Sequence, residues 1–243
     1  MADFRSFTLL HGAAPLLVAL VIVLLVGAGR AWSGSARERR LASVMAAVIL
    51  LLRVGVLLWN VMPERWSLGR SLPLQICDLA AIGSAFALLT DRRWLWSIAY
   101  FWGLALSVQG LVQPDLAAGP VSLAFWLFWL HHALIVGAAL YVVMVRGFRP
   151  VWRDLLVAWG AGLMYVAVVF PLDLLLEANY GYLGHALPSQ PTVLDWLGPW
   201  PWRVLAMVGL GALVMLVLYL PWHRAASARE AGHDVPLPRD GGT

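Results

Sequence analysis

The segment Val121–Val145 reads VSLAFWLFWLHHALIVGAALYVVMV and contains no Asp, Glu, Lys or Arg. A helix that crosses a bilayer needs roughly 20 mainly apolar residues, because each residue adds about 1.5 Å along the axis. The chain has seven such runs, each 17 to 25 residues long: Ala13–Gly29, Leu41–Val61, Leu72–Thr90, Trp94–Val112, Val121–Val145, Leu155–Leu176 and Trp202–Leu220. The sequence therefore predicts an all-α, polytopic membrane protein built as a seven-transmembrane-helix bundle.

The composition agrees with a single membrane-embedded domain over residues 1–222. Of 243 residues, 61% are hydrophobic and only 12% are charged, which is too few charges for the surface of a soluble domain of this length. The net charge of +4 does not indicate nucleic-acid binding, since the Arg residues lie in short loops and helix flanks. The single cysteine, Cys77, excludes an intramolecular disulfide.

The distribution of arginine predicts how the bundle is oriented. Twelve Arg residues fall after the first, third and fifth runs and in the C-terminal segment, whereas four fall in the remaining gaps. Cytoplasmic loops carry the excess of Lys and Arg in membrane proteins. We therefore expect the N-terminus outside, the C-terminus in the cytoplasm, and a multi-pass location in the cell membrane.

Two segments outside the runs have distinct compositions. The longest gap, 177–201, contains four prolines, two tryptophans and the sequence Asn179-Tyr180-Gly181-Tyr182, which predicts an ordered, aromatic, turn-rich lid on the outer side. The segment 223–243 is polar and contains Pro236 and Pro238, which predicts a disordered cytoplasmic tail.

Polar side chains inside the apolar runs need a reason to be there, because an ionised group at mid-membrane costs at least about 2.5–3.5 kcal/mol. Most of these groups fall in the outer half of the predicted bundle, together with two residues just beyond the sixth run: Gln75, Cys77, Asp78, Gln109 and Asp173 within the runs, and Glu177 and Asn179 beyond them. His132 lies deeper, next to His131, and Arg53 lies near the centre of its run. We expect a shared polar cavity that opens outward, with His132 at its floor.

Each of these residues also has a purely structural interpretation. A lone transmembrane cysteine often packs as a small hydrophobe. A transmembrane histidine such as His132 can simply hydrogen-bond to a neighbouring helix. Asp78 or Asp173 can pair with Arg53 or with a histidine, which favours Arg53 as a structural counter-ion. Adjacent histidines on one helix are poorly spaced for two ligands of one zinc ion, so no metal or organic cofactor is expected.

Several short motifs carry a family resemblance from about Leu72 to Trp202. They are Leu72-Pro73-Leu74-Gln75-Ile76-Cys77-Asp78-Leu79, Tyr100-Phe101-Trp102-Gly103-Leu104, Phe128-Trp129-Leu130-His131-His132, Asn179-Tyr180-Gly181-Tyr182-Leu183 and Leu194-Asp195-Trp196-Leu197-Gly198-Pro199-Trp200-Pro201. This set resembles the YwaF-like integral membrane family, which is similar to the transmembrane protein 164 acyltransferases. Many relatives have His at the position of Gln75, so any role of that histidine is lost here or passes to an amide.

The resemblance implies a lipid acyltransferase in which Cys77 is the nucleophile and His132 the general base. Membrane lipids are the expected partners, with an acyl chain moving between phospholipid and lysolipid. The expected supporting residues are Asp78, Gln75, His131, Asp173, Asn179, Tyr180 and Arg53. In this hypothesis Asp78 or Asp173 orients the histidine, and Gln75 and Asn179 donate hydrogen bonds to an oxyanion or headgroup.

One geometric difficulty and one rival function accompany this hypothesis. In untilted helices Cys77 lies about 7 Å and His132 about 17 Å below the outer boundary, so contact between them depends on tilt or on water. The rival is a non-enzymatic membrane protein that binds or transports a lipid or small solute. In that protein Cys77 would only pack, and the charged groups would form a buried polar network.

Overall fold

The structure is a computed structural model that describes residues 9–69, 71–116, 118–186 and 192–233, and within these ranges it is helical without strands. The longer helices are α1 (Leu9–Ala31), α2 (Ala36–Asn60), α3 (Ile76–Leu89), α4 (Arg93–Phe101), α6 (Leu123–Met144), α7 (Trp152–Leu175) and α8 (Trp202–His233). The shorter elements are the π-helix η1 (Trp102–Ser107), α5 (Gln109–Val112) and the 3-10 turns η2 (Tyr180–Tyr182) and η3 (Val193–Trp196).

Six segments in the described part of the chain are long and apolar enough to cross a membrane. They are Gly12–Ala31, Ala36–Asn60, Arg93–Val112, Leu123–Met144, Trp152–Leu175 and Trp202–Arg224. The predicted run at 72–90 is different, because its helix α3 has only 14 residues and begins at Ile76. Its length of about 21 Å is less than the roughly 30 Å of a bilayer core. The all-helical membrane fold is confirmed, whereas the seventh span and the orientation of the termini stay predictions.

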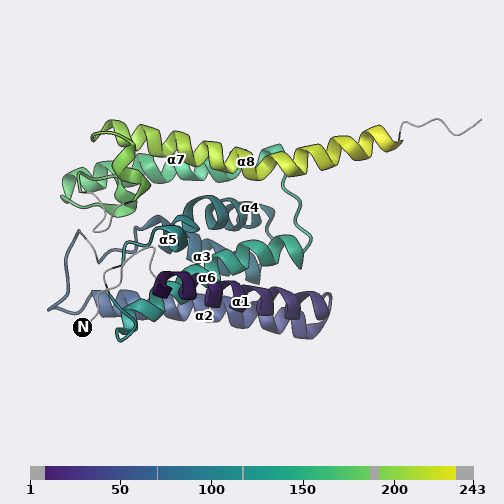
Figure 1. Cartoon of the computed structure of the whole chain (residues 1–243), viewed down its shortest axis with the longest axis horizontal. Helices are drawn as coiled ribbons and strands as arrows, with labels where there is room; N and C mark the ends of the chain where they lie inside the picture. Colours follow the sequence, from purple (N-terminus) through teal and green to yellow (C-terminus); the bar gives the residue numbers. More distant parts are fainter. Residues whose placement is uncertain (1–8, 70, 117, 187–191, 234–243) are drawn as a thin grey trace, which may run out of the picture.

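The helices form three layers (Figure 1). The antiparallel pair α7 and α8 forms one outer layer, α1 and α2 form the other, and α3, α4 and α5 lie between them, with α6 crossing from the side of α1 and α2 to the level of α3. Contacts between α2 and α3, α3 and α6, and α4 and α7 join neighbouring layers. The middle layer is therefore covered on both sides, and several of its polar side chains, such as those of Asp78, Ser84 and Ser97, are buried.

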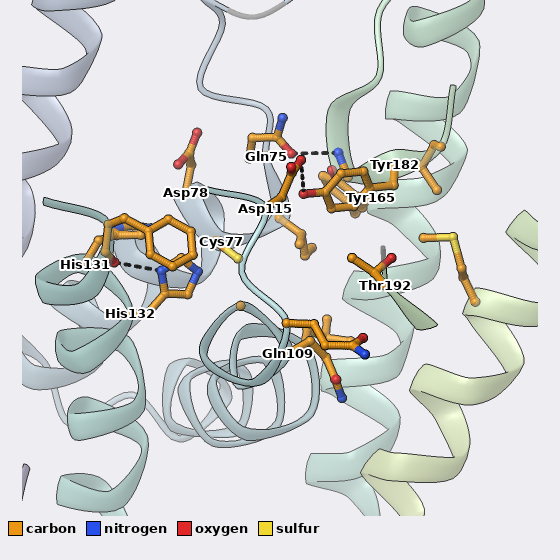
Figure 2. Close-up of a pocket in the computed structure, with 18 of the residues that line it drawn as sticks. Gln75, Cys77, Asp78, Gln109, Asp115, His131, His132, Tyr165, Tyr182 and Thr192 are labelled. Atoms are coloured by element: carbon orange, nitrogen blue, oxygen red, sulfur yellow. Dashed lines mark hydrogen bonds between the residues drawn. The ribbon is translucent and has the colours of Figure 1, made fainter. Parts of the chain in front are cut away.

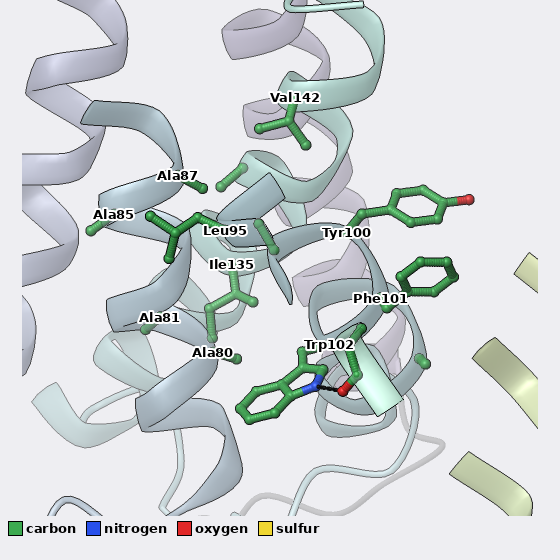
Figure 3. Close-up of a cluster of buried hydrophobic side chains, with 14 of the residues drawn as sticks. Ala80, Ala81, Ala85, Ala87, Leu95, Tyr100, Phe101, Trp102, Ile135 and Val142 are labelled. Atoms are coloured by element: carbon green, nitrogen blue, oxygen red, sulfur yellow. Dashed lines mark hydrogen bonds between the residues drawn. The ribbon is translucent and has the colours of Figure 1, made fainter. Parts of the chain in front are cut away.

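Small residues place α3 at the centre of the bundle. Ala80, Ala81 and Ala85 are fully buried and let the backbones of α2, α4 and α6 approach closely. Larger side chains fill the space around them, including Phe101 and Ile135 (Figure 3). This packing fixes the start of α3, where the thiol of Cys77 lies.

The predicted run 94–112 is helical throughout but changes its winding at η1. The change begins after Phe101, and the indole N–H of Trp102 donates to the carbonyl of Ala158 on α7 (2.9 Å). Gly103 comes next, at a place where a Cβ would lie 2.8 Å from the Cβ of Ala139 on α6. Single-turn π segments shift the helical register of the residues after them, and they occur frequently at functional sites.

A second polar cluster ties the helices together at the end of the bundle opposite the 177–201 segment. Asp154 at the start of α7 is buried, and its carboxylate accepts two hydrogen bonds from Arg93 and one from Ser97. The carboxylate of Glu38 on α2 accepts from Tyr141 (2.8 Å) and Arg146 (2.7 Å). Both carboxylates have an arginine and a hydroxyl group as hydrogen-bond donors. Their buried charges are therefore compensated, and the pairs hold neighbouring helices together.

The structure differs from the sequence expectation at the C-terminal end of the bundle. A disordered tail is predicted from His223, whereas α8 extends to His233. The sequence after Arg224 is rich in Ala with Arg229 and Glu230, which are good helix formers that extend a helix already nucleated within the bundle. The rest of the predicted tail, 234–243, lies outside the described residues.

Candidate functional site

A cavity of about 1020 Å³ lies between the layers and has walls from α2, α3, η1, α6, α7 and α8 (Figure 2). The 177–201 segment contributes Gly181, Tyr182 and the stretch Thr192–Leu194 to the same wall. This volume is at the upper end of the range typical of ligand pockets. Most of the lining is apolar, and the polar minority includes Cys77, both histidines of α6, Arg53 and Asp78.

Cys77 lies in the first turn of α3, because contacts from distant residues keep the preceding segment out of the helix. Gln75, the N-cap residue, has an extended backbone, and its side-chain oxygen accepts from the N–H of Gly181 (2.9 Å). The hydroxyl of Tyr165 on α7 donates to the carbonyl of Leu74 (2.8 Å). The thiol is half-buried, lines the cavity and lies next to the hydroxyl of Ser107. The N–H groups of a first helical turn favour a negative charge there.

One ring nitrogen of His132 forms a hydrogen bond with the backbone, and the other is free to accept a proton. Nδ1 lies 2.9 Å from the carbonyl oxygen of Phe128, which can only accept, so Nδ1 carries the proton in this bond. Nε2 then carries the lone pair of the neutral ring. It faces Gly110, where a Cβ would lie only 2.5 Å from it. The absence of a side chain at Gly110 gives the imidazole its place in the cavity wall.

His131 lies on the side of α6 that faces α3 and α2. Its ring is nearly perpendicular to that of His132, with centroids 5.1 Å apart, and it lies next to the backbone carbonyl of Cys77. Its Nε2 is buried and has no hydrogen-bond partner among the described residues. The two histidines therefore reach the same cavity from adjacent positions on one helix (Figure 2).

Arg53 and Asp78 form an ion pair inside the cavity wall. The Nη2 to Oδ1 distance is 2.8 Å, and both side chains are mostly buried. The pairing of Asp78 with Arg53, one of the alternatives that the sequence leaves open, is confirmed. It places a neutral pair, rather than an isolated charge, immediately beside Cys77.

The structure separates the predicted polar group into two sets. Gln75, Cys77, Asp78, Gln109, His131, His132 and Arg53 line the cavity together. Asp173, Glu177 and Asn179 do not line it, contrary to the expectation from their helical depth. Asp173 accepts from the backbone N–H of Tyr180 (2.9 Å), and the amide of Asn179 donates to the carbonyl of Ala186 (3.1 Å). These two groups satisfy the backbone of the 177–201 segment instead.

Tyr180 also has a structural position. Its hydroxyl donates to the carbonyl of Leu68 (2.6 Å) and accepts from the N–H of Leu72 (3.0 Å). It is fully buried and does not line the cavity. Tyr180 thus holds the loop that precedes α3, and through it the position of Cys77.

Several residues of the site escape the sequence analysis. Ser107 is buried behind the cavity wall, at the end of the π-helical segment η1 and beside the thiol of Cys77, whereas the sequence shows it only as a small residue in an apolar run. Tyr182 donates to the carboxylate of Asp115 (3.0 Å), which joins the 177–201 segment to the loop before α6. Burial and then this carboxylate raise the pKa of Tyr182, so its phenol stays a donor at neutral pH. The Tyr-Gly-Tyr motif is the one sequence signal that marks this residue.

Fold and site define a class of protein: a multi-pass helical membrane protein with a half-buried thiol and two imidazoles on one largely apolar cavity. A family model described as the TMEM164 family matches residues 6–219, so the chain belongs to that family. No curated protein and no solved structure matches the chain. In the described part of the chain, no cluster of three or more His, Cys, Asp or Glu side chains could hold a metal ion.

Proposed function

We propose that this protein is a lipid acyltransferase that moves an acyl chain between phospholipid and lysolipid through a thioester on Cys77. The observation that carries the proposal is that Cys77 and His132 line one large apolar cavity within a bundle of membrane helices. Thiols and imidazoles are the groups that covalent acyl transfer uses, and apolar walls suit acyl chains.

The first half-reaction acylates the protein. Nε2 of His132, directly or through water, accepts the thiol proton of Cys77, and the thiolate attacks the carbonyl carbon of a phospholipid ester. The carbon–sulfur bond forms and the ester carbon–oxygen bond breaks. The glycerol oxygen leaves with the proton of the imidazolium. The products are a lysophospholipid and the acyl thioester of Cys77.

The second half-reaction releases the acyl chain. The hydroxyl of an acceptor lysolipid gives its proton to His132 and attacks the thioester carbonyl. The new ester bond forms, the carbon–sulfur bond breaks, and the imidazolium returns the proton to Cys77. Water as the acceptor would make the same machinery a lipase, and a cavity that excludes water favours transfer.

Two features support ionisation of the sulfur during these steps. Cys77 lies at the N-terminal turn of α3, whose N–H groups stabilise negative charge. The neighbouring Asp78 carboxylate would oppose ionisation, but Arg53 neutralises it at 2.8 Å. The proposed role of Asp78 is therefore to complete a neutral pair beside the nucleophile rather than to orient the histidine.

One observation favours the second candidate, a non-enzymatic lipid or solute carrier. Nδ1 of His132 bonds to Phe128 and Nε2 packs against Gly110, so the ring has a complete structural role without the thiol. In a carrier, the Arg53–Asp78 pair and the histidines would only hold the cavity open to a ligand.

A transfer assay separates the two functions. The purified protein, its Cys77→Ser form and its His132→Ala form are incubated with a phospholipid labelled in one acyl chain and an unlabelled lysolipid. The proposal expects labelled product only with an intact Cys77, and a rate about 10²–10⁴-fold lower for His132→Ala. Equal transfer by the wild type and Cys77→Ser would overturn it.

The covalent intermediate gives a second readout. Because Cys77 is the only cysteine of the chain, an acyl adduct that neutral hydroxylamine removes is a thioester and must sit on it. Intact-protein mass spectrometry without acceptor should show this adduct on the wild type and lose it in Cys77→Ser. A wild type that binds phospholipid without adduct or transfer would instead establish the carrier.

A further inference from the structure

The cavity extends well beyond the thiol, into the space between α7 and α8. Its walls there are Trp159, Gly162 and Leu163 on α7 and Met207, Gly211 and Met215 on α8. None of these side chains carries a charge. Tyr165 lies at the same depth as Leu74, because its hydroxyl donates to the carbonyl of that residue. Trp159 precedes Tyr165 by six residues on α7, which is about 9 Å further from the 177–201 segment. The cavity therefore continues away from the 177–201 segment as an apolar channel.

The channel is continuous with the thiol through one short stretch of η1. The hydroxyl of Ser107 lies beside the thiol of Cys77. The adjacent residue, Leu106, lines the cavity, and its Cδ2 would lie 3.5 Å from a Cβ on Gly211. A molecule whose carbonyl reaches the sulfur can thus extend an apolar tail past Leu106 toward α8.

Two glycines keep this channel open. A Cβ on Gly162 would meet no atom within 4 Å, and one on Gly211 would meet only the Leu106 side chain at ordinary contact distance. Both residues line the cavity. Gly160 and Gly209, two residues earlier on the same helices, are exposed, have free space as well, and do not line the cavity. The chain thus offers a matched pair of glycines on each helix.

We infer that the space between α7 and α8 is the binding site for one acyl chain of a glycerophospholipid, and that Gly162 and Gly211 set which chain lengths it accepts. Its role in catalysis rests on the function proposed above, but chain binding itself does not. The outward face of α8 is apolar and exposed, as at Leu205 and Leu213, so the channel lies one helix away from the lipid that would supply the chain.

The channel can select between acyl chains of different length only through its shape. A chain that moves from lipid to an apolar protein wall gains little from the hydrophobic effect, because both surroundings are equally apolar. A misfit of a few methylene groups changes binding to a shaped apolar pocket about tenfold or more. Side chains that project from positions 162 and 211 would shorten the space and penalise long chains first.

The test compares the lipids that variants bind without any chemistry. Gly162→Leu and Gly211→Leu are made in the Cys77→Ala protein, with Gly160→Leu and Gly209→Leu as controls. Each purified protein is equilibrated with mixed micelles of phosphatidylethanolamines that carry 12- to 20-carbon chains, and the bound lipid is identified by mass spectrometry. The ratio of long to short chains should fall at least about tenfold for positions 162 and 211 and stay unchanged for 160 and 209.

Smaller variants guard against a folding failure. Gly162→Ala and Gly211→Ala add one methyl group, which the open space accepts, and should shift the same ratio less. An unchanged profile in both the Leu and Ala variants, or an equal shift in the controls, would overturn the inference. If the variants shift the chain-length ratio but the wild type shows no Cys77-dependent transfer, the proposed reaction is contradicted and the proposed binding site is supported.

Discussion

The guanidinium of Arg53 lies 2.8 Å from the carboxylate of Asp78, and this ion pair joins α2 to the first turn of α3. Arg53 and Asp78 therefore neutralise each other next to Cys77. Nε of Arg53 is buried and has no hydrogen-bond partner among the described residues, so the pair is only partly satisfied. A pair of this kind is costly to break from one side, because the partner is left as a buried, uncompensated charge.

This relationship predicts strong coupling between the two positions. Asp78→Leu and Arg53→Met should each lower stability by roughly 3–5 kcal/mol, whereas the double variant should lose much less than the sum. Unfolding midpoints in detergent give the comparison. Additive losses in the double variant would mean that the two charges do not depend on each other.

The parts of the fold that depend on local composition are the ones that the sequence predicts well. The helix α6 is expected at 121–145 and found at Leu123–Met144, because a continuous apolar run with Ser122 as its N-cap determines it locally. The start of α3 is expected at Leu72 but found at Ile76. Tyr165 and Tyr180, about 100 residues away, hold the intervening backbone, and no local pattern shows such contacts.

The candidate site likewise contains residues that the sequence places correctly and residues that it does not. Membrane depth along each run correctly brings Cys77, Gln109 and His132 to one cavity. Depth alone fails for Asp173 and Asn179, because it does not show which way a side chain points at a helix end that turns into a loop. Ser107 is missed because it is only a small residue in an apolar run, and the π-helical segment that it ends has no distinctive sequence signal.

Two of the acidic residues that pair with arginine at the end opposite the 177–201 segment, Asp154 and Asp91, should differ in importance for stability. The Asp154 carboxylate is buried and accepts from Arg93, Ser97 and the N–H of Val151. We expect Asp154→Asn to cost roughly 3 kcal/mol of stability, because it places an amide against these donors. Asp91, whose side chain is 78% exposed in its pair with Arg146, serves as the control.

Asp91→Asn should change the unfolding midpoint by the equivalent of at most about 1 kcal/mol, and added salt should remove even that difference. The effect of Asp154→Asn should persist in salt, since that carboxylate is buried. Similar losses for both variants would show that burial does not decide the strength of these pairs.

The bond between Tyr182 and Asp115 should impose a pH dependence on stability. Burial and the carboxylate raise the pKa of Tyr182 above the value of about 10 that an unfolded chain has. The stabilisation is therefore complete below pH ~10 and is lost as the pH rises from there toward the raised pKa. The free energy of unfolding of the wild type should exceed that of Tyr182→Phe by about 1.5 kcal/mol between pH 6 and 9.

The measurement is the difference between the two unfolding midpoints in detergent from pH 6 to 11. Subtracting Tyr182→Phe removes the contribution of the other tyrosines. A difference that grows above pH 10, or that is already lost at pH 8, contradicts this assignment of the proton.

Gly110 offers a test of His132 that leaves the imidazole in the chain. Gly110→Ala would place a Cβ 2.5 Å from Nε2 and 2.8 Å from Cδ2 of His132, so the ring must move or lose its bond to Phe128. A displacement of about 1 Å of a catalytic group costs about 10²-fold in rate. We expect that loss in the acyl-transfer assay. Gly27→Ala, on α1 with no atom within 4 Å of the new Cβ, should be neutral.

The double variant decides whether the loss acts through the histidine. If Gly110→Ala impairs transfer only by displacing His132, adding it to His132→Ala should lower the rate no further, because groups that act as a unit are not additive. A further loss would mean that Gly110 shapes the cavity for substrate independently of the base. Equal rates for Gly110→Ala and the wild type would show that Nε2 of His132 has no part in the transfer.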